Sequence, residues 1–216
     1  MHNNVKRERV IVPDDKSLFF YGWGYHKLFD KQNLKARELI VDLVPEEVSV
    51  LDIACGTGEL CFALREKKNC LVIGVDISLR MLRFAEKSNP YDEVTFIHGD
   101  ATDLGDFEDG SFDYATMLVL MHELTEENQT RVFHEALRVA RKVILVDSKS
   151  PLPRNFFGLG IRLVEATFGH DHNRNFKNFL KNGGIDGVLR HSLLPLSLES
   201  QSVFGSNCRE IVMVSR

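Results

Sequence analysis

The sequence contains few cysteines, and their spacing suggests neither a disulfide framework nor a structural metal site. Only four occur in 216 residues, with no Cys-x-x-Cys pair and no zinc-type spacing of histidine and cysteine. We therefore expect free thiols in a reducing compartment, which predicts a cytoplasmic protein. The four residues are Cys55, Cys61, Cys70 and Cys208.

The chain also lacks a long apolar run and a strong excess of charge. It has no apolar stretch of about 18 residues and no signal-peptide pattern, so we expect no transmembrane segment. A formal net charge of −4 gives no general attraction to nucleic acid, and we find no specific nucleic-acid signal. The length suits a single domain, and nothing in the sequence excludes a homodimer.

A glycine is missing where a dinucleotide-binding loop needs one. Residues 52–58 (DIACGTG) follow an apolar run and precede a helical pattern, which predicts a strand, a tight turn and a helix N-terminus. The third glycine of Gly-x-Gly-x-x-Gly would fall on Cys61 or, in the other register, on Glu59. The loop therefore fits a dinucleotide poorly. The carboxylate of Asp52 would repel a pyrophosphate but attract an ammonium group.

Three acidic residues stand at the ends of three successive predicted strands. They are Asp52, Asp76 and Asp100. The carboxyl ends of parallel strands form the ligand-binding edge of an open sheet, where the second of these acids binds ribose hydroxyls in nucleotide folds. Asp100 can accept a hydrogen bond from an exocyclic amine. A ligand with an amine, a ribose and an adenine is indicated, and S-adenosylmethionine has all three.

Predicted strands and helices alternate over the first two thirds of the chain. This alternation predicts a parallel sheet with helices on both faces. Residues 150–185 then interrupt the pattern with prolines, aromatics, histidines and a predicted helix at 175–181. Two β-like runs close the chain at 196–203 and 209–215. The other expected strands are 48–54, 70–75, 93–98, 112–119 and 142–147, and the other expected helices are 34–44, 58–67, 78–88 and 126–140.

With these motifs the chain resembles the class I S-adenosylmethionine-dependent methyltransferases, in the small-molecule (type 11, quinone-biosynthesis-like) branch. The resemblance covers positions 34–147. It implies a Rossmann-like α/β fold: a doubly wound, mostly parallel seven-stranded sheet with a C-terminal antiparallel strand pair and a helical lid insertion. It also implies one domain, 1–216, made of an N-terminal cap (1–33), a cofactor-binding core (34–149), the insertion (150–185) and the last strand pair (186–216).

The resemblance also implies roles for individual residues. Segment 52–58 would hold the methionyl end of S-adenosylmethionine, Asp76 the ribose, and Asp100 with Ala101 the adenine. Ala54 stands where the family most often has its first glycine. The cofactor-binding residues expected in this way are Asp52, Ala54, Cys55, Gly56, Gly58, Asp76, Ile77, Met81, Gly99, Asp100, Ala101 and Leu118.

Methyl transfer from a sulfonium depends mainly on positioning, so no fixed catalytic residue is required. Two catalytic candidates remain open. His122 follows the fourth predicted strand and is either a base or acceptor-binding group, or a capping or surface histidine. Tyr21 is the best candidate in the aromatic run 19–25, which lines the acceptor pocket, lies over the cofactor or anchors the N-terminus to the domain.

The insertion contains a second group of histidines. His170 and His172 bracket Asp171, but no further ligand lies at metal-binding spacing, so we expect a polar turn and no metal. The apolar side chains of this segment suit either a pocket for a lipophilic acceptor or packing onto the domain. They are Phe156, Phe157, Leu159, Ile161, Leu163 and Phe168.

We therefore expect an S-adenosylmethionine-dependent methyltransferase with a small-molecule acceptor, which would be lipophilic if the insertion forms its pocket. Three alternatives remain: a protein or RNA methyltransferase, a non-catalytic cofactor-binding subunit, and an NAD-dependent oxidoreductase. The Asp/Asn-Pro-Pro-Tyr loop of enzymes that methylate nucleobase or glutamine nitrogens is absent after the fourth predicted strand. This absence argues against the first alternative.

Overall fold

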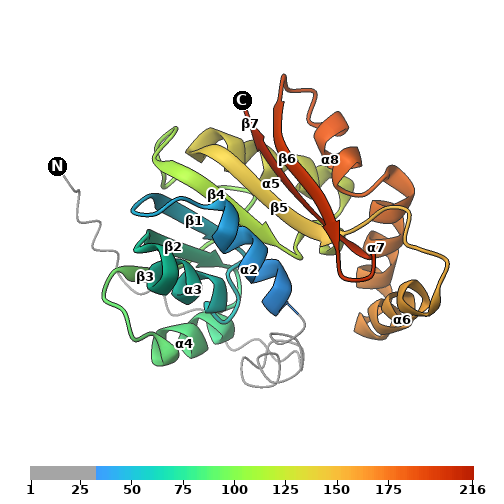
Figure 1. Ribbon diagram of the computed structural model, residues 1–216, viewed down its shortest axis with the longest axis horizontal. Helices are drawn as coiled ribbons and strands as arrows, with labels where there is room; N and C mark the ends of the chain where they lie inside the picture. Colours follow the sequence, from blue (N-terminus) through green and yellow to red (C-terminus); the bar gives the residue numbers. More distant parts are fainter. Residues whose placement is uncertain (1–32) are drawn as a thin grey trace.

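The computed structural model describes residues 33–216, and a seven-stranded sheet forms its centre. The strand order is β3-β2-β1-β4-β5-β7-β6 (Figure 1). Strands β1 to β5 pair in parallel, whereas β7 runs antiparallel to both β5 and β6. The strands are β1 (Ser49–Ile53), β2 (Leu71–Asp76), β3 (Val94–His98), β4 (Phe112–Leu118), β5 (Ala140–Ser148), β6 (Ser197–Phe204) and β7 (Arg209–Ser215).

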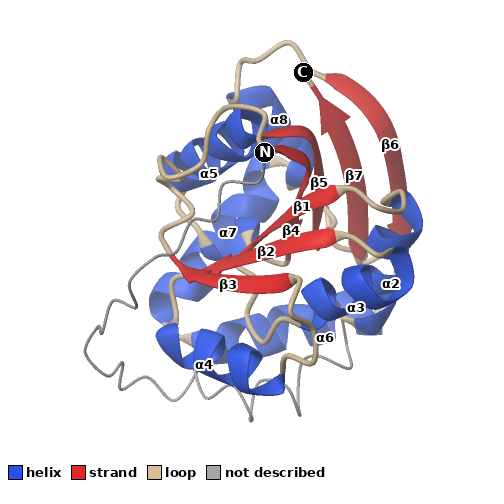
Figure 2. Cartoon of the chain, turned by 90° about the vertical axis from the view of Figure 1, so that its left-hand side faces the viewer, coloured by secondary structure: helices blue, strands red, loops and turns tan. Residues whose placement is uncertain are grey.

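Helices cover both faces of the sheet, as Figure 2 shows. Helices α2 and α3 lie on one face and α5, α7 and α8 on the other. The helices are α2 (Leu34–Leu43), α3 (Glu59–Lys68), α4 (Leu79–Ser88), α5 (Glu126–Val139), α6 (Phe156–Glu165), α7 (His170–Asn182) and α8 (Ile185–His191), with the 3-10 helices η3 (Met121–Glu123) and η4 (Ala166–Phe168). Among the described residues, no helix is long and apolar enough to cross a bilayer.

The apolar pattern of the central strands explains why the sheet has two cores. Strand β1 is buried on both faces, as expected for a parallel strand between two helical layers. Its Val50 packs among the residues under α2 and α3, whereas Leu51 faces the core formed with α5 and α8. The expected fold, a doubly wound and mostly parallel sheet with an antiparallel C-terminal pair, is confirmed.

The predicted element boundaries hold for the parallel strands and their helices but not for the insertion. The helix expected at 175–181 begins at His170, so the polar turn expected at 170–172 is instead the first turn of α7. Helix α6 was not expected, because Gly158 and Gly160 lower its helix propensity. The side chain of Asn155 caps its start by accepting a hydrogen bond from the Gly158 N–H at 3.0 Å.

Candidate active site

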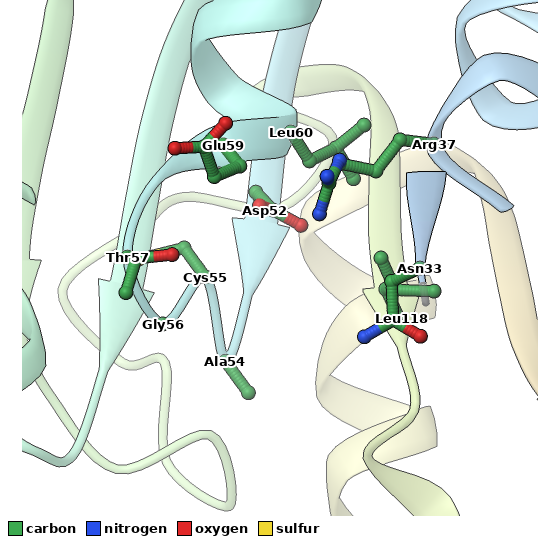
Figure 3. A pocket seen from close by; sticks show the side chains of 10 residues that line it. All are labelled: Asn33, Arg37, Asp52, Ala54, Cys55, Gly56, Thr57, Glu59, Leu60 and Leu118. Carbon is green, nitrogen blue, oxygen red and sulfur yellow. The ribbon is translucent and has the colours of Figure 1, made fainter. Parts of the chain in front are cut away.

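The loop between β1 and α3 forms the wall of a small, partly open cavity at the carboxyl edge of the sheet (Figure 3). Five of the residues that the sequence assigned to the cofactor line it, and one of these, Leu118, reaches it from the end of β4. Five further lining residues were not expected. The lining is Asp52, Ala54, Cys55, Gly56 and Leu118, together with Asn33, Arg37, Thr57, Glu59 and Leu60.

Two positions in this loop are occupied by glycine for different structural reasons. Gly56 has φ +54°, and a Cβ built on it would meet no atom within 4 Å, so its backbone borders open space. Gly58 has φ +80°, and a Cβ there would lie 2.5 Å from Cζ of Phe96. Ala54 also adopts a left-handed backbone, with φ 60°, which explains why the family favours glycine at this position.

Asp52 is buried beside the cavity, with 2% of its surface exposed. The Thr116 hydroxyl donates a hydrogen bond to its Oδ1 at 2.7 Å, and the Cys61 thiol donates one to Oδ2 at 3.4 Å. Burial raises the pKa of Asp52 to about 7 despite these two bonds, and the charge of Asp76 adds to the increase. The guanidinium of Arg37 opposes it. Asp52 is therefore poised to lose a proton when a cationic group approaches.

The acids at the ends of β2 and β3 organise their own loops. The Asp76 carboxylate accepts a hydrogen bond from the Gly56 N–H at 2.8 Å and another from the Ser78 N–H at 2.8 Å. Asp76 thus links the end of β2 to the loop after β1. Asp100 is exposed, and its Oδ1 accepts bonds from the Thr102 N–H and hydroxyl, each at 2.8 Å.

Seven of the expected cofactor residues do not line the cavity itself. Ile77, which directly follows Asp76 in the sequence, is 64% exposed. Such exposure is unusual for a large apolar side chain. Met81 is buried in α4, where its N–H bonds the capping Ser78. The seven residues are Gly58, Asp76, Ile77, Met81, Gly99, Asp100 and Ala101, spread over the loops after β1, β2 and β3.

One polar atom at the cavity has no hydrogen-bond partner among the described residues. It is Oδ1 of Asn33, a residue that is 7% exposed and lines the cavity just before α2 (Figure 3). A buried amide oxygen without a donor is costly unless a ligand supplies one. Asn33 and the buried Asp52 therefore make this end of the cavity suitable for an ammonium group. The residues present fit the methionyl end of S-adenosylmethionine.

A second polar cluster lies beyond the end of β4. The chain leaves this strand through Val119, which adopts φ 63°, a rare conformation for a β-branched residue and a source of local strain. Its N–H donates to the Val146 carbonyl at 2.7 Å and keeps the two strand ends together. The next turn, η3, places His122 directly beside Asp147 at the end of β5.

His122 is buried and held by one carboxylate at two points. Its Nδ1 lies 2.7 Å from Oδ1 of Asp147, and its backbone N–H donates to Oδ2 at 3.2 Å. Burial disfavours a charged imidazole, but the charge and hydrogen bond of Asp147 outweigh it and raise the pKa of His122 to about 9. In turn, His122 lowers the pKa of the buried Asp147. The interpretation of His122 as a surface histidine is wrong.

The insertion completes this cluster with two further side chains. His172 on α7 places Nε2 2.6 Å from Oε2 of Glu165, the last residue of α6. The same Glu165 oxygen lies 3.6 Å from Nε2 of His122. His170, which the sequence grouped with His172, is instead 90% exposed in its side chain, 3.8 Å from Asp171.

Sequence reasoning therefore found His122 but missed its partners Asp147 and Glu165. The signal for Asp147 was present, because it stands at the end of an apolar strand, as the three acids assigned to the cofactor do. Glu165 gave no signal, since it follows an apolar helix without a recognisable spacing. Tyr21 and the aromatic run 19–25 lie outside the described residues.

Comparison with known proteins agrees with this geometry. A family model described as a methyltransferase domain matches residues 50–142. Demethylmenaquinone methyltransferase of Bacillus licheniformis is 30% identical over 185 residues, which cover 81% of this chain and 78% of that protein. The chain belongs to the class I S-adenosylmethionine-dependent methyltransferases. This methyltransferase therefore uses S-adenosylmethionine and acts on a small-molecule acceptor.

Solved structures similar to this methyltransferase share its fold. A protein of Pyrococcus horikoshii OT3 is 26% identical, with a TM-score of 0.67, and the match covers 89% of this chain and 98% of that one. The magnesium protoporphyrin IX methyltransferase of Synechocystis PCC 6803, with bound SAH, is 17% identical with a TM-score of 0.63. That match covers 92% of this chain and 96% of the other.

Proposed function

We propose that this methyltransferase methylates a quinol-type acceptor, an aromatic ring with an ionisable hydroxyl and an apolar substituent. The observation that carries the proposal is the buried Asp147–His122 pair, which lies just beyond the strand end that borders the cofactor cavity. Support for the acceptor class comes from the name of the Bacillus licheniformis relative, a demethylmenaquinone methyltransferase.

We assign the cofactor end of the site to residues of three strand ends. Asp52, Asn33 and the backbone at Gly56 hold the methionyl end, because they combine a carboxylate, an unpaired amide oxygen and open backbone. Asp76 holds the ribose, and Asp100 with Ala101 holds the adenine. Bound S-adenosylmethionine supplies a methyl group on a sulfonium, which an acceptor nucleophile takes while S-adenosylhomocysteine leaves. The exposed Ile77 would contribute an apolar contact to the cofactor.

The acceptor end is formed by the cluster around His122 and by helix α6. An acceptor hydroxyl loses its proton more readily near a polar group that stabilises the anion, and His122 is the group that Asp147 orients for this. Helix α6 exposes large apolar side chains that suit a lipophilic substituent, which is why we propose the insertion as the cover of this end. They are Phe156, Phe157, Leu159, Leu163 and Val164. Tyr21 remains a proposed second acceptor contact.

The test is transfer of a labelled methyl group to a reduced naphthoquinone with an isoprenoid tail and to the same ring without the tail. We expect transfer to both, with a lower KM for the tailed acceptor because burying apolar surface favours binding. Calorimetry with S-adenosylmethionine and NAD accompanies it. Cofactor binding without transfer to either quinol would overturn the acceptor assignment, and binding of NAD alone would overturn the entire site assignment.

We also propose a cytoplasmic location and leave a homodimer as a prediction. The location is supported by the four cysteines, all of which are free and buried. Light scattering on the purified chain decides the oligomeric state, and a mass of one chain at all concentrations would exclude the dimer.

A further inference from the structure

We propose that His122, Glu165 and His172 form a binding site for one divalent transition-metal ion, with Zn²⁺ as the best match. Each residue offers one ligand atom, and the three atoms all lie within 4.8 Å of one another. Two imidazole nitrogens and one carboxylate oxygen are a ligand set that zinc takes in catalytic sites, where a fourth position stays open. The residues come from η3, α6 and α7, so the cluster exists only in the folded chain.

The distances suit a metal after a small adjustment. Ligand atoms about 2.0–2.2 Å from a tetrahedral zinc lie about 3.3 Å from one another. The separation of His122 Nε2 and Glu165 Oε2 is 3.6 Å, close to that value. His172 Nε2 and Glu165 Oε2 are 2.6 Å apart, a hydrogen bond that a small rotation of the glutamate side chain opens.

Asp147 supplies the support that metal-bound histidines usually have. A histidine ligand typically gives its other ring nitrogen to a carboxylate, which fixes its tautomer and orientation. Nδ1 of His122 lies 2.7 Å from Asp147, so Nε2 is the nitrogen that faces Glu165. Asp147 therefore holds one nitrogen of the imidazole ring, and the other nitrogen is available to bind a metal ion. Both oxygens of Asp147 already accept hydrogen bonds from backbone or imidazole groups.

The charges and the surroundings of the cluster also favour a cation. Asp147 and Glu165 place two carboxylates against two imidazoles. Aromatic rings enclose the site: Phe176 stacks edge-on to His122 at 5.6 Å, and Phe168 to His172 at 5.1 Å. Apolar walls around polar ligands strengthen their hold on a metal ion.

A metal ion here would fasten the insertion to the sheet. The ligands from α6 and α7 would be tied to η3, which directly follows β4 and the cofactor cavity. With Nε2 of His122 on the ion, the ion and no longer the imidazole would stabilise the acceptor anion, through its open fourth position. That last role rests on the proposed function, whereas binding of the metal does not.

The experiment titrates Zn²⁺ into metal-free full-length chain without an affinity tag, against a competing chelator, and repeats the titration with Co²⁺. We expect one ion per chain, a rise in Tm on binding and, for Co²⁺, the intense visible absorption of a tetrahedral site. Glu165→Gln and His172→Asn should each weaken binding by about tenfold or more, since losing a ligand costs at least as much as losing a group that only supports one. His170→Asn is the matched control, since it removes an exposed histidine two positions away.

Three outcomes would overturn the proposal: no stoichiometric Zn²⁺ uptake, uptake that both cluster variants keep, or an equal loss in His170→Asn. The Tm of each metal-free variant is measured first, so that a folding defect is separated from a lost ligand. S-adenosylmethionine binding is measured on the same samples. Cofactor binding without zinc rejects the metal site alone, and zinc binding without cofactor rejects the proposed function while the metal site stands.

Discussion

The two ends of the site differ in how the chain builds them. At the cofactor end, a backbone turn and three strand-end acids come from 52–58, 76 and 100, segments separated by one strand and one helix each. At the proposed acceptor end, His122, Asp147 and His172 meet from elements that share no local motif. A tight backbone turn restricts which residue types can occupy it, so it leaves a recognisable pattern in the local sequence. A cluster of side chains from distant segments leaves no such local pattern, because only the folded chain brings them together.

This difference predicts that the two ends respond separately to substitution. The insertion packs onto η3 and α5, whereas the cofactor loop packs onto α3 and β2. A change beneath the insertion should therefore alter stability without altering cofactor affinity, whereas a change of an acidic residue at a strand end should alter cofactor affinity.

The largest expected effect is that of Phe176→Ala, which removes a fully buried ring of α7 packed against His122. The free energy of unfolding should fall by about 3–5 kcal/mol, the usual range for deleting a buried phenylalanine. Urea denaturation measures this loss, and calorimetry should find the affinity for S-adenosylmethionine unchanged. Lys177→Ala, an exposed neighbour, is the control. A large drop in cofactor affinity in Phe176→Ala would mean that the two ends are not separate.

Next in size is Asp76→Ala at the cofactor end. Loss of this partly buried hydrogen-bond acceptor should weaken binding of S-adenosylmethionine by about 1–3 kcal/mol, because the Gly56 N–H bond and the proposed ribose contacts are both lost. Calorimetry measures the Kd, with the exposed Asp92→Ala as control. An unchanged Kd would show that Asp76 is misassigned.

The affinity for S-adenosylmethionine should also depend on pH through Asp52. Its pKa in the free protein is about 7, and an ammonium group beside it favours the carboxylate, so binding below that pH releases a proton. Affinity should rise by up to roughly tenfold per pH unit as pH increases towards 7. Asp52→Asn should bind more weakly with a flat profile. Calorimetry in two buffers of different ionisation enthalpy counts the proton, and a count of zero at pH 6 would contradict the assignment.

The same raised pKa has a consequence for stability, with a definite sign. Asp52 holds its proton more tightly when folded, so its contribution to stability is complete below its ordinary pKa of 3.8. The contribution is lost as pH rises through about 7. The free energy of unfolding of the cofactor-free protein should therefore decline less with rising pH in Asp52→Asn than in the original protein.

The smallest effect is expected for Ala54→Gly, which relieves a left-handed backbone at φ 60°. The relief of about 1–2 kcal/mol is partly offset by the greater freedom of glycine in the unfolded chain, so we expect a gain of about 0.5 kcal/mol. Ala63→Gly, inside α3, should instead lose about 1 kcal/mol. Thermal denaturation of both variants tests the contrast, and a loss of stability in Ala54→Gly would mean that its methyl group packs usefully.

The sequence predicted the parallel sheet closely, because its strands are largely apolar runs and most of them end near a small or acidic residue. The small residues after the first strand also located the turn at 52–58. The position of His122 just after the fourth strand placed it next to the end of the sheet that borders the cavity. Helix α6 was missed because its two glycines hide a helical apolar pattern. The partnership of His122 with Glu165 was missed because contacts across 43 positions leave no trace in local spacing.

The four buried cysteines have a practical consequence. Burial raises the pKa of Cys55 to about 11 and that of Cys61 well above its ordinary value, so both thiols react slowly with alkylating reagents. A single cysteine introduced at an exposed position of α6, such as Leu163, would then carry a fluorophore without removal of the native thiols. Its emission would report how the insertion moves while cofactor, acceptor or metal ion is added.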